Sequence, residues 1–207
     1  LSASPKDNKV SWDLSGTYAL DKDVNLYART ATGFRGSSVQ GAGAFNGKSV
    51  ADAETVTSVE AGIKADLLER RLRLNFGVFN YNVKDLQLTA VGGSGNANVL
   101  LNAKKATGRG FEMDMQALLT NNLLASLGVG YNATKIKDPN LVVSACGNGQ
   151  SPPPPPPPPA PPAPPPDPVP NCTITDPNFF DAASNSQKAN IDGNPLPQAP
   201  KTTVNFT

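Results

Sequence analysis

Few residues in this sequence are of the types that perform catalysis or bind metal ions. None of the 207 residues is a histidine, which excludes Ser-His-Asp catalysis, Cys-His catalysis and histidine-ligated metals within this chain. Oxygen ligands for calcium could come only from scattered aspartates whose spacing matches no calcium-binding loop, so we interpret them as turn formers. These aspartates are Asp138, Asp176, Asp181 and Asp192. We therefore expect neither an enzyme nor a bound metal or other cofactor.

The two cysteines, Cys146 and Cys172, could form a covalent cross-link. In an oxidising compartment they predict one disulfide, and the alternative is two free thiols. Between them lies a proline-rich insert, residues 147–171, in which residues 152–170 favour polyproline II. A straight rod of that length would span about 59 Å, whereas a disulfide brings two Cα atoms to about 5.5 Å. Since both cannot hold, we predict that the disulfide forms and the proline tract bends.

Another group of residues carries charge at positions that alternate with apolar ones. Side chains two residues apart in a β-strand point to the same face. Glu60 and Lys64, for example, alternate with Val59, Ala61 and Ile63. Such charges would lie on the polar face of a sheet, where they either contact a solute or form cross-strand pairs that keep the strands in register. The candidates are Arg29, Glu60, Lys64, Arg73, Glu112 and Asp114.

The strands that must position these side chains follow from the same alternation. Five segments have apolar residues at every second position, and two more favour strands. The five are 10–20, 57–65, 72–78, 111–117 and 123–131, and the two are 24–34 and 202–207. Period two is typical of a strand with one apolar face. We predict an all-β antiparallel meander whose outer face carries Trp12, Leu74, Phe76, Met113 and Leu127.

The connections between these strands alternate between short and long. Residues 21–23, 66–70 and 120–122 predict tight turns, whereas residues 35–54 and 135–199 are long polar excursions. Transmembrane β-barrels have short periplasmic turns at one rim and longer extracellular loops at the other. Strands of about 9 to 11 residues also suit a tilted crossing of a bilayer. The predicted fold is therefore part of a transmembrane β-barrel with long extracellular loops.

Turn lengths also predict which residues lie opposite one another. A glycine-rich β-hairpin centred near Gly93 should project above the membrane. It should bring Arg73 close to Asp114, which would offset a repulsion between Arg73 and Lys64 across the preceding turn. The predicted cross-strand pairs are Lys64 with Arg73, Glu60 with Gly77, and Glu112 with Gly130.

Five stretches, in this order, resemble the barrel of TonB-dependent receptors. They are VNLYARTATGFRG (24–36), TVTSVEAGIKADLLERRLRLNFGVFNYNVKDLQL (55–88), NAKKATGRGFEMDMQA (102–117), LLASLGVGYNATKIKDP (123–139) and NPLPQAPK (194–201). The resemblance covers nearly the whole chain. It implies a barrel of about twenty-two strands around an N-terminal plug domain. Residues 1–207 would then form part of that barrel, about seven strands with an extracellular proline-rich insert, without the plug or the final strands.

The resemblance also implies a function and a set of partners. Such a receptor takes up a scarce solute of the siderophore, vitamin or carbohydrate class across the outer membrane of a Gram-negative bacterium. The TonB protein supplies the energy, and the six candidate charges would face the lumen and contact plug or solute. Outer-membrane lipid is a further partner, whereas a net charge of +1 gives no reason to expect nucleic acid. The alternative is a passive porin or an adhesin-type barrel, which would lack an upstream plug and TonB box.

Overall fold

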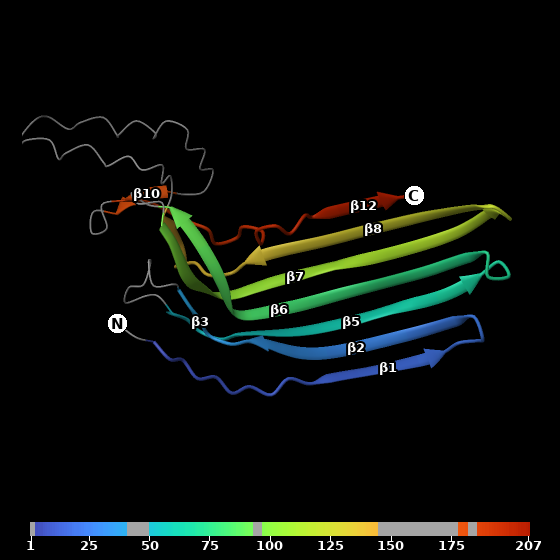
Figure 1. The fold of residues 1–207 in the computed structure, drawn as a ribbon, viewed down its shortest axis with the longest axis horizontal. Coiled ribbons are helices and arrows are strands. Elements are labelled where there is room, and N and C mark those ends of the chain that lie inside the picture. The colour runs from blue at the N-terminus through green and yellow to red at the C-terminus, as the bar shows by residue number, and fades with distance from the viewer. Residues whose placement is uncertain (1–2, 41–49, 93–96, 145–177, 182–185) are drawn as a thin grey trace, which may run out of the picture.

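A computed structural model describes most of the chain, as strands joined by turns (Figure 1). The described residues are 3–40, 50–92, 97–144, 178–181 and 186–207. They include no helix that is both long and apolar enough to cross a membrane. Cys146, Cys172, the insert at 147–171 and Asp176 lie outside these ranges. The disulfide and the bend of the proline tract therefore stay predictions.

Seven strands form one antiparallel sheet in the order β1-β2-β5-β6-β7-β8-β12. Their bounds are β1 Asp13–Ala19, β2 Val24–Arg35, β5 Glu54–Leu67, β6 Leu72–Gly92, β7 Ala97–Thr120, β8 Leu123–Ile136 and β12 Thr202–Phe206. The sheet follows the order of the chain, and β1 and β12 form its two edges (Figure 1). Each of the seven predicted strands is present, and the predicted all-β antiparallel meander is confirmed.

Two strands run far beyond the predicted segments. β6 and β7 pair with each other as far as Gly92 and Ala97, which confirms the hairpin near Gly93. Both strands turn away from their neighbours as they approach this hairpin loop (Figure 1). Asp85, with a φ of 54°, interrupts the ladder at this end. The alternation did not predict five short strands in the long connections, namely β3 Ser38–Val39, β4 Val50–Ala51, β9 Val142–Ser144, β10 Asn178–Asp181 and β11 Ser186–Asn190.

The register sorts the side chains of the sheet onto two faces, because residues directly opposite each other point the same way. One row across β2 to β12 reads Tyr27, Gly62, Gly77, Glu112, Gly130 and Thr203. We call this side the polar face, and all six candidate charges lie on it. The next row reads Leu26, Ile63, Phe76, Met113, Val129 and Val204. We call this side the apolar face, and it also carries Leu74 and Leu127, as predicted.

Two of the three predicted cross-strand pairs are wrong, and both involve β5 and β6. Lys64 lies opposite Asn75, and Glu60 lies opposite Phe79. The turn comprises the four residues between Leu67 and Leu72, because these two pair with each other. Three consecutive residues of this turn, Leu68, Glu69 and Arg70, have positive φ. The turn is centred one residue further along the chain than predicted, which moves every partner by two residues but keeps each side chain on its predicted face.

The predicted pairing of Arg73 with Asp114 is also wrong, because the β6–β7 hairpin pairs Gly92 with Ala97 and is centred one residue beyond the predicted position. Arg73 lies opposite Gln116, and Asp114 lies opposite Asn75. The Arg73 guanidinium instead donates from Nε to Asp66 at 2.8 Å across the β5–β6 turn. The third pair, Glu112 with Gly130, is confirmed.

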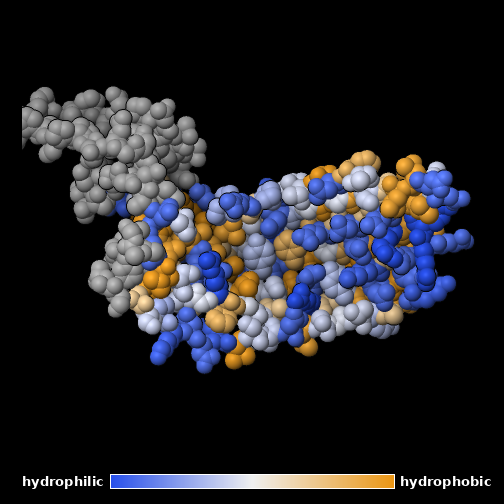
Figure 2. All heavy atoms as spheres, viewed as in Figure 1, coloured by the Kyte–Doolittle hydropathy of each residue, from blue (hydrophilic) through white to orange (hydrophobic). Residues whose placement is uncertain are grey.

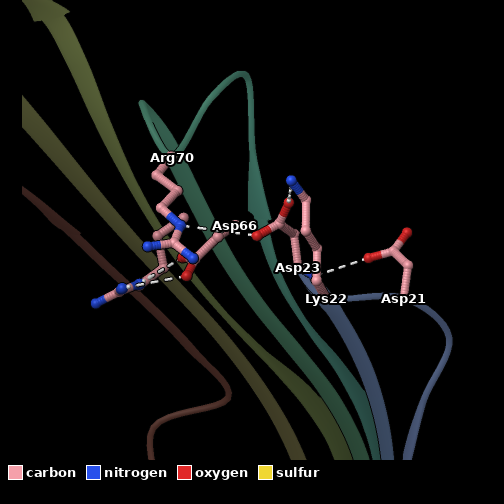
Figure 3. A network of polar contacts seen from close by, with 6 residues as sticks. Asp21, Lys22, Asp23, Asp66 and Arg70 are labelled. Atoms are coloured by element: carbon pink, nitrogen blue, oxygen red, sulfur yellow. Dashed lines mark hydrogen bonds and ion pairs between the residues drawn. The ribbon is translucent and has the colours of Figure 1, made fainter.

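Hydrophilic residues gather at the rim that carries the short turns (Figure 2). Asp21 accepts the backbone N–H of Asp23 at 2.7 Å, which stabilises the β1–β2 turn. Asp23 lies 3.7 Å from Arg70 of the β5–β6 turn, and Asp66 stands beside this pair (Figure 3). These side chains are partly or largely exposed, so their ion pairs add little stability. Their contribution is to hold neighbouring turns side by side.

A small apolar core lies at the other end of the sheet, beside the long connections. Its buried members are Ala103, Ile136 and Leu141, and the half-buried Leu86, Leu88, Leu101, Ile191 and Leu196 pack around them. The core joins the extensions of β6 and β7 to residues that follow β8 and precede β12. Leu141, Ile191 and Leu196 of the long connection are thus packed against the sheet.

Gln87 holds the other connection, between β2 and β5, in the same region. Its side chain is 7% exposed. Nε2 donates to the carbonyl oxygens of Gly36 at 2.8 Å and Asp52 at 3.0 Å, and Oε1 accepts the Ser38 hydroxyl at 2.6 Å. The Gln87 backbone N–H donates to Glu54 at 2.8 Å. One buried amide therefore ties both ends of this connection to β6.

Candidate functional site

A hollow of about 370 Å³ opens on the polar face and is lined by residues of β2, β5, β6, β7 and β8. Three carboxylates in its wall, Glu60, Glu112 and Asp114, are candidates predicted from the sequence. Aromatic rings complete the wall, namely those of Tyr27, Phe79 and Tyr81. The β-pleat places these side chains together, because each occupies a polar-face position of its strand.

Glycines make room for the tyrosine rings of this wall. A Cβ atom on Gly62 would lie 2.5 Å from Cε1 of Tyr27, and one on Gly77 would lie 2.6 Å from its hydroxyl oxygen. A Cβ on Gly108 would lie 2.1 Å from Cζ of Tyr81. Because a side chain at these positions would collide with the rings, glycine allows each tyrosine to lie flat across the neighbouring strands. The floor of the hollow is therefore backbone.

The three carboxylates of the hollow have no cationic partner among the described side chains. Tyr27 donates its hydroxyl to Oε1 of Glu60 at 2.6 Å. The Lys64 ammonium lies over the Tyr27 ring, 5.4 Å from its centroid, in a cation–π contact. Arg29 lies directly opposite Glu60 but is ion-paired with Asp13, so Lys64 and the three carboxylates leave the hollow with an excess of negative charge.

A polar atom without a partner lies in the same wall. Oδ1 of Asn132 is buried and accepts no hydrogen bond from any described residue. A buried acceptor without a donor is costly. Asn132 therefore leaves one unsatisfied acceptor within the wall of the hollow.

The remaining candidate charges take part in ion pairs between strands. Arg29 donates from Nε to Asp13 of β1 at 2.9 Å, and Arg73 pairs with Asp66. The structure thus divides the six candidates. Glu60, Glu112 and Asp114 line the hollow, Lys64 stands beside it over Tyr27, and the two arginines form cross-strand pairs.

Sequence reasoning missed the aromatic members of the wall. Each lies opposite a glycine of the adjacent strand: Tyr27 opposite Gly62, Phe79 opposite Gly110, and Tyr81 opposite Gly108. The sequence does show large aromatic residues at polar-face positions of the strands, and this was a signal that could have been used. Their pairing with glycines was not, because it depends on the register.

The described residues contain no group of three metal-ligating side chains placed to hold an ion. Asp138 is 4% exposed and accepts the backbone N–H groups of Lys104 at 3.0 Å and Asn140 at 3.3 Å. Asp192 accepts the backbone N–H of Asp138 at 2.7 Å. These contacts agree with the interpretation of both aspartates as turn formers.

Comparison with known proteins gives one family. Residues 2–207 match the family model described as TonB dependent receptor-like, beta-barrel. Among solved structures, the siderophore receptor PiuA from Acinetobacter baumannii has a TM-score of 0.56 and 16% identity, over 95% of this chain and 23% of that chain. The ferric-catecholate import receptor Fiu from K12 E. coli has a TM-score of 0.46 and 17% identity, over 62% and 18%. The alcaligin outer-membrane receptor FauA from Bordetella pertussis has a TM-score of 0.42 and 19% identity, over 64% and 23%. The chain spans less than a quarter of each of these proteins.

Proposed function

Because the family model covers residues 2–207, the chain belongs to the TonB-dependent receptor β-barrel family, and we propose that it forms part of the wall of an active importer. Proteins of this family are transporters of the outer membrane of Gram-negative bacteria, not enzymes. The uptake of a scarce solute, energised through TonB, is the activity that we propose for the whole protein.

The contrast between the two faces of the sheet supports this function best. Leu26, Ile63, Phe76, Met113 and Val129 form a continuous apolar row that suits the hydrocarbon of a bilayer. The polar face, with its charges, glycines and acidic hollow, suits a water-filled lumen. A wall with these two faces separates lipid from an aqueous path.

We propose that the acidic hollow receives positively charged groups from inside the barrel. Glu60, Glu112 and Asp114 have no cationic partner among the described residues, and a plug domain would fill the lumen they face. Lysine or arginine side chains of the plug would complete the pairs and hold the plug against this part of the wall. Arg29 and Arg73 then keep the strands in register, and Lys64 supports Tyr27.

For the solute we propose a ferric siderophore, with a vitamin or a carbohydrate as the other classes. The similarity to PiuA, a siderophore receptor, supports this choice. The binding residues would come from the long connections, because loops on a rigid scaffold carry most binding sites.

Deleting the coupling protein tests the proposed activity. Cells that express the full-length receptor should lose uptake of radiolabelled ferric siderophore when TonB is deleted, yet keep binding it at the surface. Complementation with TonB should restore uptake. Uptake that continues unchanged in the deletion strain would instead support the passive porin.

Neutralising the hollow tests its role. The full-length double variant Glu112→Gln/Asp114→Asn should bind solute at the surface as wild type does. Its rate of solute uptake should differ from that of wild type, because the plug is held less firmly. Glu69→Gln is the matched control, since this exposed residue lies in the β5–β6 turn, away from the hollow. Identical transport by the double variant and wild type would reject the proposed contact with the plug.

A further inference from the structure

Charge is distributed very unequally on the apolar face of the seven-stranded sheet. None of the described residues on this face of the sheet is aspartate or glutamate. The acids that pair in the ladder, such as Glu60, Asp66 and Glu112, occupy the polar face, and Asp85 lies outside the ladder. The apolar face nevertheless carries five cations at one end of β6, β7 and β8, and all five are exposed. They are Lys84, Lys105, Arg109, Lys135 and Lys137.

The register brings these five side chains into one patch. Lys84 lies directly opposite Lys105. Lys137 lies on the other side of Lys105, because its backbone N–H donates to the Lys105 carbonyl oxygen at 2.8 Å. Lys135 lies opposite Thr107, and Arg109 is two residues from Thr107 along β7. We call these five residues the basic patch. Lys84 of β6, Lys105 of β7 and Lys137, the residue after β8, thus stand side by side, where like charges repel.

Nothing in the described part of the chain neutralises the basic patch. No member makes an ion pair with a described acid, whereas Lys104, beside Lys105 in the chain, pairs with Asp138 at 3.8 Å. A cluster of exposed cations without counter-charges attracts an anionic partner. Because the cluster lies on the face that the proposed function turns toward lipid, that partner should belong to the membrane.

The position of the basic patch along the strands indicates the headgroup region of the membrane. An aromatic row lies on the apolar face, at the side of the apolar residues that is nearer the long connections. In this row the ring centroid of Phe111 lies 5.9 Å from that of Tyr131 and 6.0 Å from that of Phe76. Aromatic girdles of this kind lie at the membrane interface. Arg109 is two residues beyond Phe111, about 7 Å along the strand, and Lys105 is six residues beyond it, about 20 Å. The basic patch therefore starts at the interface and extends away from the hydrocarbon, at the end of the sheet with the long connections.

We propose that the basic patch binds the phosphate groups of the glycolipid that forms the outer leaflet, at the level of lipid A. Charge complementarity supports this occupant, because several phosphates on one lipid headgroup match a row of lysines on adjacent strands. Lys201, whose ammonium lies 5.7 Å from the centroid of the Tyr131 ring, adds a cation at the lower edge of the patch. The inference rests on the proposed function for its orientation in the membrane, but not on energy coupling.

Lipid binding by the purified full-length receptor tests this inference. The triple variant Lys84→Gln/Lys105→Gln/Lys137→Gln is compared with wild type in neutral phosphatidylcholine nanodiscs titrated with diphosphorylated lipid A. A basic residue near an anionic membrane surface contributes about fivefold in affinity, so three together give about 100-fold at low salt. We expect the triple variant to bind lipid A at least about tenfold more weakly at physiological salt, where screening reduces the effect.

Matched controls separate the patch from general charge and from misfolding. Lys6→Gln/Lys22→Gln/Arg70→Gln removes the same charge from exposed positions outside the patch and should bind lipid A as wild type does. The triple arginine variant of the patch lysines keeps the charge and should retain binding.

Three results would overturn the inference. The first is equal binding by wild type and the glutamine variant when both show the heat-modifiable gel mobility of a folded barrel. The second is equal binding of dephosphorylated lipid A. The third is displacement by millimolar inorganic phosphate, which would identify a soluble anion as the occupant. Lipid A binding is measured without TonB. The inference about lipid A and the proposed uptake function can therefore be rejected independently of each other.

Discussion

Replacing Gly62 by alanine should destabilise the barrel, because the site leaves no room for a Cβ atom. That atom would lie 2.3 Å from the Phe76 carbonyl oxygen and 2.5 Å from Cε1 of Tyr27. The backbone oxygen cannot move without disturbing the β5–β6 ladder, and displacing the ring weakens the 2.6 Å hydrogen bond from Tyr27 to Glu60. Overpacking costs about 1–3 kcal/mol, and a hydrogen bond to a charged group contributes about 1.5–3 kcal/mol. We expect the free energy of unfolding to fall by about 2–4 kcal/mol, since these two costs overlap.

Guanidinium unfolding of the full-length receptor in detergent, followed by tryptophan fluorescence and heat-modifiable gel mobility, measures this loss. Gly128→Ala is the matched control on the same face, because its Cβ would meet nothing closer than Asp114 Oδ1 at 3.4 Å. It should change the free energy of unfolding by less than about 0.5 kcal/mol. Adding Tyr27→Ala to Gly62→Ala should not restore stability, since the collision with the Phe76 oxygen remains. Equal stability of Gly62→Ala and Gly128→Ala would refute the reasoning.

Three further predictions concern Gln87, Asp138 and the two cysteines. Gln87→Ala should lower the free energy of unfolding by about 1–3 kcal/mol, because the part-buried carbonyl oxygens of Gly36 and Asp52 lose their donor, and limited proteolysis should then cleave the β2–β5 connection faster; unchanged cleavage would contradict this role. Asp138→Asn should cost about 1–3 kcal/mol in the same unfolding assay, because an amide nitrogen cannot accept the Lys104 backbone N–H; stability equal to wild type would show that this carboxylate is dispensable. Mass spectrometry under non-reducing conditions should find Cys146 linked to Cys172, whereas two free thiols would reject the predicted disulfide.

The amino-acid sequence determined which residues share a face within each strand. Successive side chains of a strand point to opposite sides whatever lies next to it, so the alternation alone places Glu60 with Lys64 and Glu112 with Asp114. The alternation also located five of the seven main strands. Local geometry was enough for these features, because the pleat depends only on the backbone of its own strand.

Only the tertiary structure decided which strand positions lie side by side. A slip of two residues leaves every side chain on its face, so alternation cannot distinguish Arg73 from Asn75 as the partner of Lys64. The β5–β6 turn made that choice through the left-handed backbone of Leu68, Glu69 and Arg70. The same long-range pairing places Tyr27 over Gly62 and brings the cations of three strands into the basic patch. These features depend on contacts between residues distant in sequence, which no pattern within a single strand contains.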